Sequence, residues 1–175
     1  SVTKQFTAML ILQLVEQGKL SLDARLSDVL PYYRKDTGAK ITIHHLLTHT
    51  SGLGDYLEHK DYKARLAALR SVADALPLIY EQKPLFPAGE RFQYSNSGML
   101  MLGGVIEKVS GMPYREFIRR RIFGPCGMTA SGIAYEDEIL PDRAIGYTQH
   151  ADGSFAANIL VIPAPCPAGG LRASA

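Results

Sequence analysis

Residues 1–18, SVTKQFTAMLILQLVEQG, hold the pattern from which the fold of the whole chain can be inferred. Their apolar side chains recur at the spacing of an amphipathic helix, at Phe6, Met9, Leu10 and Leu14. Gly18 then stands where a helix end favours a residue that tolerates a positive φ. We therefore expect one helix from Ser1 to about Gln17, with those four apolar residues on its buried face.

Ser1 and Lys4 lie three positions apart at the start of this helix, and that spacing places two side chains on one helix face. A lysine amine in such a position can take the proton of a serine hydroxyl once burial and the positive end of the helix dipole disfavour its charged form. The same pattern also fits an N-cap serine followed by a solvated lysine. The pair is therefore a candidate nucleophile and base that needs a second group to support it.

Beyond the first helix, the pattern predicts further helices joined by short extended segments. Helices are expected over residues 26–30, 44–48, 62–80, 96–109 and 114–122. Pro77 should end or kink the third of these. Extended segments are expected at residues 41–43, 92–94, 133, 144–148 and 155–162. The predicted fold class is mainly α with short strands, and a length of 175 residues fits one domain.

A second candidate site is the triplet Tyr94-Ser95-Asn96, which follows a Pro/Gly connector at residues 83–90 and precedes a helix. A tyrosine can relay a proton when neighbouring cations lower its pKa, and an asparagine amide can orient a substrate carbonyl or a lysine. The alternative is a helix cap with a packed tyrosine. Side chains at such a loop-to-helix junction can converge on a cleft, so the triplet is a candidate partner for Ser1 and Lys4.

Composition argues against several other functions. The formal net charge of +2 gives no strong field for a polyanion, and the three consecutive arginines at residues 119–121 would spread over different helix faces, so no nucleic-acid partner is expected. The longest apolar run of the first helix, residues 8–12, is far too short to cross a bilayer, so no membrane span is expected. Residues 98–104 lack the lysine and hydroxyl residue of a phosphate loop, and no cofactor is implied.

Histidines and cysteines give no persuasive metal or disulfide pattern. His45 and His49 have the spacing of zinc-binding helices, but no glutamate lies between them and no third ligand is evident, so no metal is expected. Together with His44, they are better interpreted as partly buried imidazoles bonded to nearby loop backbone. Cys126 and Cys166 lack CxxC spacing, which favours two free, partly buried thiols.

Five segments, taken in order, resemble the serine beta-lactamase-like hydrolases. They are SVTKQFTA at residues 1–8, GKLSLD at 18–23, IHHLLTHTSGL at 43–53, PAGERFQYSN at 87–96 and GPCGM at 124–128. More narrowly, they resemble the class C branch, which includes beta-lactamases, D-alanyl-D-alanine peptidases and carboxylesterases. The resemblance extends over nearly the whole chain, and it implies the helical region of the α/β beta-lactamase/transpeptidase-like fold.

The resemblance also implies roles for the two candidate motifs. The nucleophile and its lysine partner fall on Ser1 and Lys4, and the tyrosine and asparagine of the second motif fall on Tyr94 and Asn96. The implied activity is acyl transfer through an acyl-enzyme on a beta-lactam, a D-Ala-D-Ala peptide or a carboxylic ester. Its partner would be a small molecule or a peptidoglycan peptide. The alternative from another class is a penicillin-recognising sensor or scaffold domain without turnover.

A third family motif, Lys-Thr-Gly or His-x-Gly, is expected after Tyr94, but the nearest text, Asp36-Thr37-Gly38, precedes it. By resemblance, residues 1–175 are then a partial domain that begins at the nucleophile motif, ends before the third motif and lacks most of the antiparallel sheet. One oxyanion donor would be missing, so we expect little turnover from this chain alone. The resemblance favours a periplasmic or extracellular protein, and a cytoplasmic one stays open.

Overall fold

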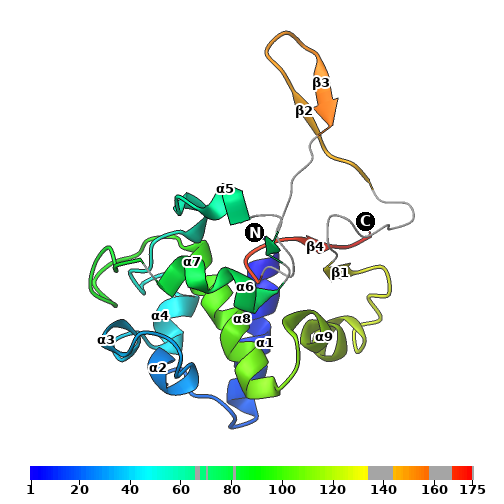
Figure 1. The fold of residues 1–175 in the computed structure, drawn as a ribbon. Helices are drawn as coiled ribbons and strands as arrows, with labels where there is room; N and C mark the ends of the chain where they lie inside the picture. The colour runs from blue at the N-terminus through cyan, green and yellow to red at the C-terminus, as the bar shows by residue number, and fades with distance from the viewer. Residues whose placement is uncertain (66–67, 70, 81, 134–143, 158–166, 175) are drawn as a thin grey trace.

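The computed structural model describes residues 1–65, 68–69, 71–80, 82–133, 144–157 and 167–174 (Figure 1). The helical elements are α1 (Thr3–Glu16), α2 (Leu26–Val29), α3 (Lys35–Gly38), α4 (Ile43–Leu47), the 3₁₀ turn η1 (Tyr56–Glu58), α5 (Tyr62–Arg65), α6 (Val72–Ala75), α7 (Pro77–Tyr80), α8 (Asn96–Ser110), α9 (Tyr114–Ile118) and the π-helical turn η3 (Arg119–Phe123). The predicted fold class, mainly α with short strands, is confirmed.

The strands within the described residues form two small antiparallel pairs. They are β1 (Gly132–Ile133) with β4 (Leu171–Arg172), and β2 (Tyr147–Gln149) with β3 (Phe155–Ala157). The β2–β3 hairpin turns through Gly153, whose φ is +83°, and it projects away from the helices (Figure 1). Asp152-Gly153 is a dipeptide typical of such a hairpin turn. Strand β4 has only two residues, and so short a strand has no sequence period from which it could be predicted.

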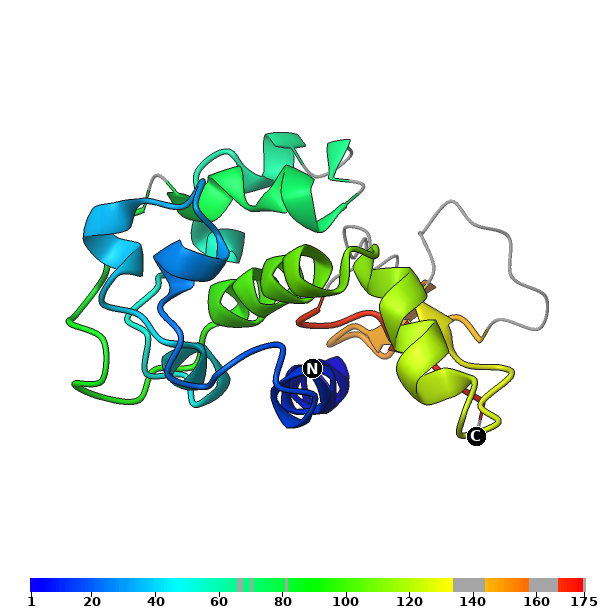
Figure 2. The same cartoon turned by 90° about the horizontal axis from the view of Figure 1, so that it is seen from below.

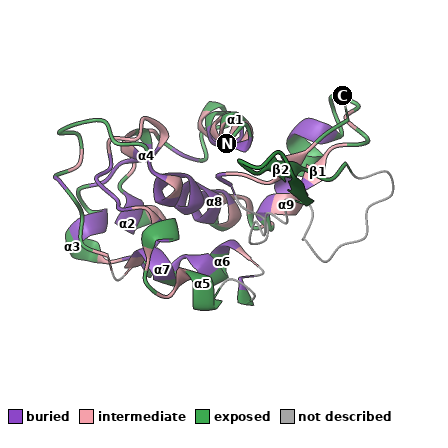
Figure 3. Ribbon diagram, turned by 90° about the horizontal axis from the view of Figure 1, so that it is seen from above, coloured by how far each residue is buried: buried purple, intermediate pink, exposed green. Residues whose placement is uncertain are grey.

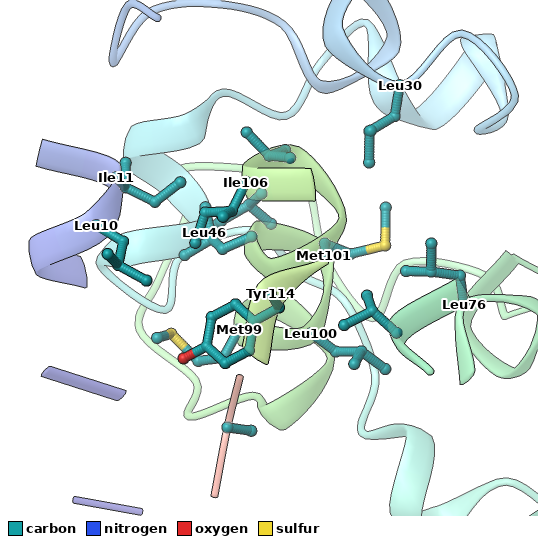
Figure 4. Packing of buried hydrophobic residues seen from close by; sticks show 14 of the residues in the cluster. Leu10, Ile11, Leu30, Leu46, Leu76, Met99, Leu100, Met101, Ile106 and Tyr114 are labelled. Carbon is teal, nitrogen blue, oxygen red and sulfur yellow. The ribbon is translucent and has the colours of Figure 1, made fainter. Parts of the chain in front are cut away.

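Helix α8 is the centre of the core. Its residues from Ser97 to Ile106 are buried, so that the helix is covered on every side (Figure 3). In Figure 4, Leu10 and Ile11 of α1, Leu46 of α4 and Tyr114 of α9 lie around it. A helix that is apolar all round has to be surrounded by other elements. The short helices therefore serve to cover α8, and its N-terminus is fixed with respect to all of them.

Both ends of α8 are set by local chemistry, as the sequence predicted. The Ser95 hydroxyl accepts a hydrogen bond from the Gly98 N–H at 3.1 Å, which caps the N-terminus. Gly111 ends the helix in the left-handed conformation, with φ +69°. The boundaries of α8 follow from these two residues.

Glycines of α8 allow its neighbours to approach closely. A Cβ on Gly103 would lie 2.1 Å from Pro167 Cγ, and one on Gly98 would lie 3.5 Å from the Leu46 carbonyl oxygen. These glycines make residues 98–104 a close packing surface of α8. Met99 and Met101 are buried core residues rather than part of a cofactor site.

Helix α1 runs beside α8 (Figure 2), but its buried face differs from the predicted one. The buried residues are Thr3, Thr7, Leu10, Ile11 and Leu14. Met9 is 51% exposed, and Phe6 is only partly buried. The reason is that two threonines belong to the core: the Thr7 hydroxyl donates to the Pro167 carbonyl at 2.6 Å and lies 2.7 Å from the Tyr114 hydroxyl. Leu10 and Leu14 are buried as predicted, but counting apolar residues alone missed Thr3 and Thr7 and wrongly included Met9.

The same threonine face of α1 holds the segment 167–172. The Thr3 hydroxyl accepts a hydrogen bond from the Leu171 N–H at 3.0 Å, and Thr7 binds the Pro167 carbonyl. Residues distant in sequence are thereby held along the first two turns of α1. The consequence is that the backbone of Ala168 lies beside Lys4.

Two segments differ from their predicted structure. Residues 62–80 are not one helix: α5, α6 and α7 are separate turns, because Ser71 caps a new helix by accepting from the Asp74 N–H and Pro77 begins another. Residues 92–94 form no strand. The Gln93 N–H binds the His49 carbonyl at 2.8 Å, a single loop contact in place of a strand ladder.

Three smaller predictions concern the surface of the molecule. In the part of the chain that the structure describes, no helix combines the length and apolar character that a bilayer crossing requires. The arginines at 119–121 are exposed, as expected, and two of them pair with Glu116. Cys126 is exposed rather than partly buried, because it lies in the turn after η3. Cys166 lies outside the described residues.

Candidate active site

The first turn of α1 and the segment that leads into α8 bring the four predicted side chains together. The Ser1 hydroxyl lies 2.7 Å from the Tyr94 hydroxyl, and Lys4 Nζ donates to Ser1 Oγ at 3.2 Å. Lys4 Nζ also donates to Asn96 Oδ1 at 2.8 Å. The predicted approach of Tyr94 and Asn96 to Ser1 and Lys4 is therefore confirmed, although more than ninety positions separate Ser1 from Tyr94. Helix α1 itself begins at Thr3, so Ser1 lies just before it.

The amine of Lys4 is surrounded by oxygen acceptors. Besides Ser1 Oγ and Asn96 Oδ1, it donates to the carbonyl oxygen of Ala168 at 2.8 Å. Three acceptors match the three N–H bonds of an ammonium group. The side chain is thus fixed in one position, and the charged form of Lys4 has a partner for each of its protons.

The phenol of Tyr94 lies beside this positive charge. Lys4 Nζ is 4.8 Å from the centroid of the Tyr94 ring. Partial burial raises the pKa of Tyr94, but hydrogen bonds with Lys4 and Ser1, together with the positive charge of Lys4, outweigh burial and the opposing charge of Asp55. The net pKa of Tyr94 lies below its ordinary value of about 10. The phenolate is therefore easier to form here than in water.

Asp55 fixes the orientation of the Asn96 amide. Its carboxylate accepts from Asn96 Nδ2 at 2.8 Å and from the Leu57 N–H at 3.0 Å, where it caps η1. Because the amide nitrogen of Asn96 is bound to Asp55, the amide oxygen faces Lys4. Asp55 thus determines which end of the amide the lysine meets.

His45 and His49 accept hydrogen bonds from backbone N–H groups. Nδ1 of His45 accepts from the Thr42 N–H, and Nδ1 of His49 accepts from the Ser95 N–H, each at 3.2 Å. The interpretation of these two imidazoles as bonded to nearby loop backbone is confirmed. In the described ranges, no group of three or more metal-binding side chains comes together. The ring of His49 also stacks on Tyr94, with 4.8 Å between ring centroids.

Three contributors to the site were not predicted from the sequence. They are the carboxylate of Asp55, the ring of His49 and the carbonyl of Ala168. Asp55 stands immediately before the helical turn η1, a position that indicates a cap and nothing more. Ala168 contributes only its backbone, so no side-chain pattern marks it. Each was recognisable only after the fold had brought separate segments together.

This arrangement has the elements needed to activate a hydroxyl. Ser1 Oγ lies between a phenol whose pKa is lowered and an amine held by three acceptors. A proton leaving Ser1 has an oxygen 2.7 Å away to receive it. A nucleophile and base within hydrogen-bond distance, with the base held by a third group, is the geometry of nucleophilic catalysis.

Sequence relatives bear the names of penicillin-binding and ester-hydrolysing proteins. The chain is 35% identical over 155 residues to "Penicillin-binding protein 4*" of Bacillus subtilis, covering 84% of this chain and 32% of that protein. It is 34% identical over 154 residues to "Esterase EstB" of Burkholderia gladioli, covering 76% and 37%. The chain spans about a third of the length of these curated relatives.

A solved structure shares the fold. The penicillin-binding protein from Bacillus halodurans superposes with a TM-score of 0.84 at 40% identity, covering 96% of this chain and 52% of that one. Residues 1–175 match the Beta-lactamase family along their whole length. Together with the cluster of Ser1, Lys4, Tyr94 and Asn96 on the helical core, these matches show that the chain belongs to the Beta-lactamase family and has the beta-lactamase/transpeptidase-like fold.

Proposed function

We propose that the protein is a serine hydrolase that works through an acyl-enzyme formed on Ser1. The observation that supports this most directly is the continuous set of contacts from Tyr94 to Ser1, Lys4 and Asn96. Membership of the Beta-lactamase family supports the same chemistry. The substrate would be a carboxylic acid derivative: a beta-lactam, a D-Ala-D-Ala peptide or an ester.

Each of the four residues has a defined step in this mechanism. The Tyr94 phenolate takes the proton of the Ser1 hydroxyl, and Oγ attacks the substrate carbonyl carbon to form a tetrahedral adduct. The positive charge of Lys4 stabilises the phenolate before this transfer. The adduct collapses as Tyr94 gives the proton to the leaving nitrogen or oxygen, which leaves an ester on Ser1. Asn96 holds Lys4 and offers its amide to the substrate.

Deacylation repeats the transfer with water as the nucleophile. Tyr94 takes a proton from water, the resulting hydroxide attacks the Ser1 ester, and Tyr94 returns the proton to Oγ. Fast deacylation gives a hydrolase. A protein that acylates but does not deacylate would be a penicillin-recognising sensor, so the lifetime of the adduct separates the two functions.

The test uses the full natural protein that contains this chain, because the chain spans about a third of its curated relatives. Hydrolysis of a chromogenic cephalosporin and of a p-nitrophenyl ester is measured for the native protein and for Ser1→Ala and Lys4→Ala. Both substitutions should lower kcat by at least about 100-fold while leaving substrate binding largely intact. Undiminished hydrolysis by Ser1→Ala would rule out the covalent mechanism.

A further inference from the structure

His49 has an unusual backbone conformation next to the site. Its φ is +57°, and it is the one non-glycine residue with a positive φ among those that the structure describes. Side chains with a Cβ seldom adopt this region, and such outliers persist where the surrounding structure holds them.

The contacts of His49 all converge on the segment that carries Tyr94. Its carbonyl accepts from the Gln93 N–H at 2.8 Å, and its Nδ1 accepts from the Ser95 N–H at 3.2 Å. These two hydrogen bonds hold the backbone of Gln93, immediately before Tyr94, and of Ser95, immediately after it. The left-handed backbone is what lets the carbonyl and the ring of one residue reach both positions.

The imidazole ring also packs directly against the phenol. The rings of His49 and Tyr94 lie 4.8 Å apart between centroids at an interplanar angle of 28°, a stacked arrangement. The ring of Phe92 also contacts the His49 ring, edge-on, with 5.9 Å between the ring centroids and an interplanar angle of 80°. Tyr94 is 46% exposed, so few other side chains restrict its ring. The stack on His49 is a main restraint on where the Tyr94 hydroxyl lies.

The hydrogen bond to Ser95 requires a neutral imidazole, because Nδ1 can accept only without its own proton. The charged and titratable groups that face the ring are Lys4 from α1 and Tyr94 from the segment before α8. Burial and then the positive charge of Lys4 lower the pKa of His49. The neutral form is therefore the one present near pH 7.

We propose that His49 is a positioning residue that holds the Tyr94 phenol at hydrogen-bond distance from Ser1. The inference rests on the proposed function, in which Tyr94 transfers the proton. Without the two backbone hydrogen bonds and the stacked ring, the phenol would leave its place beside Lys4 and Ser1. Its pKa would then return toward 10, and proton transfer would slow while substrate binding stayed largely unchanged.

Two substitutions separate positioning from general support of the fold. His49→Ala removes both Nδ1, which accepts from the Ser95 N–H, and the ring that stacks on Tyr94. His49→Asn keeps an acceptor for the Ser95 N–H, and asparagine tolerates the left-handed region, but the ring is lost. His44→Asn is the matched control, because His44 is exposed, lies in α4 before His49 and has its ring against that of His45.

The experiment measures kcat, KM and the pH dependence of ester hydrolysis in the full natural protein, with thermal unfolding as the check of folding. We expect kcat of His49→Ala to fall about 10- to 100-fold with KM nearly unchanged, because a small misplacement of a reacting group has effects of this size. His49→Asn should lie between this variant and the native protein. The midpoint of the pH profile should move toward 10 in His49→Asn and further in His49→Ala. His44→Asn should match the native protein in all three measurements.

A second measurement does not depend on turnover. Tyrosine labelled with ¹³C at Cζ reports each phenol's ionisation by NMR, and Tyr94→Phe identifies the signal of Tyr94. The midpoint of that titration should be higher in His49→Asn than in the native protein. An unchanged midpoint, or a loss of kcat without any shift, overturns the positioning role. If the native protein never acylates Ser1, the proposed function fails, but the midpoint of the NMR titration still tests the role of His49. If His49→Ala does not fold, the comparison of His49→Asn with the native protein tests that role.

Discussion

Lys4 interacts with more groups than its place beside the nucleophile requires. Its amine donates to a hydroxyl, an amide oxygen and a backbone carbonyl, from Ser1, Asn96 and Ala168. A lysine that is held in this way acts best as a fixed positive charge, because every N–H bond already has an acceptor. In the proposed mechanism, the phenol of Tyr94 rather than the amine of Lys4 therefore accepts the proton of Ser1.

The ionisation of Tyr94 predicts how the rate depends on pH. Only the phenolate can accept a proton, so kcat/KM should rise as pH increases through the pKa of Tyr94 and level off above it. Because the surroundings lower this pKa, the midpoint should lie below 10. Tyr94→Phe should lose the rising limb along with most of the activity. A rate that falls through the same range would contradict the assignment of Tyr94 as the base.

Asp55 gives a second prediction at this scale. Asp55→Asn replaces one acceptor of Asn96 Nδ2 by an amide that can also present N–H groups, so the Asn96 amide is no longer fixed with its oxygen toward Lys4. Loss of one such hydrogen bond, about 1 to 1.5 kcal/mol, should reduce kcat about 10-fold in the ester assay. Asp61→Asn is the control, because the Asp61 carboxylate lies in a surface ion pair with Arg65, at 4.0 Å. Equal rates for the two variants would show that Asp55 does not orient Asn96.

At the scale of elements, the contact between α8 and the segment 167–172 connects the core to the site. Pro167 lies against Gly103 of α8, and the next residue supplies the carbonyl that binds Lys4. The threonines of α1 hold the same segment from the other side. A change in the packing of α8 should therefore reach the active site through the backbone of Ala168.

Gly103→Ala tests this connection. The added Cβ would lie 2.1 Å from Pro167 Cγ, so the segment has to move away. We expect overpacking to lower the free energy of unfolding by about 1 to 3 kcal/mol, with a parallel loss of kcat. Gly169→Ala is the matched control, since no atom lies within 4 Å of its added Cβ. Thermal unfolding and ester hydrolysis measure the two effects, and a Gly103→Ala protein that resembles Gly169→Ala in both would refute the coupling.

The elements that the sequence predicted well are those whose ends have their own chemistry. Gly18 follows α1 with φ +67°, and Ser95 and Gly111 bound α8. The segment 62–80 was predicted wrongly, because its apolar spacing is compatible with a helix while Ser71 and Pro77 start new turns. The apolar spacing of a segment therefore predicts a single helix correctly only where no residue within the segment starts a new one.

The residues of the candidate site also fall into two groups, those that the sequence predicted and those that it did not. Ser1 and Lys4 are close in sequence, so helical spacing already placed them together, and the triplet at Tyr94 was marked by its position before a helix. Their meeting with Asp55 and the Ala168 carbonyl depends on how α1, α8 and the segment 167–172 pack. Packing of distant segments has no period in the sequence, and for that reason these partners were missed.

For the whole molecule, the partly buried carboxyl group of Glu107 makes stability depend on pH. Glu107 of α8 accepts the Tyr114 N–H at 2.8 Å and so joins α8 to the start of α9. Burial raises the pKa of Glu107 above its ordinary value, against the effect of that hydrogen bond. The folded protein therefore takes up the proton more readily than the unfolded chain. This contribution to stability is fully present below the ordinary glutamate pKa and is lost as pH rises through the folded-state value.

Glu107→Gln should remove this dependence while keeping an acceptor for the Tyr114 N–H. We expect the variant to unfold at a higher temperature than the native protein at pH 7, because it avoids the burial of a charge. The difference should narrow as the pH falls toward 4. Glu16→Gln, at the exposed end of α1, is the control and should change little. A difference that widens on acidification would contradict the sign of the Glu107 shift.

The most direct test of the central claim is to find which residue becomes acylated. The full natural protein is mixed with a beta-lactam and, separately, with a p-nitrophenyl ester, quenched in acid, digested and analysed by mass spectrometry. We predict an acyl group on the peptide that contains Ser1, at Ser1 itself, and no adduct in Ser1→Ala. Acylation at a different residue, or turnover by Ser1→Ala at the native rate, would contradict the account.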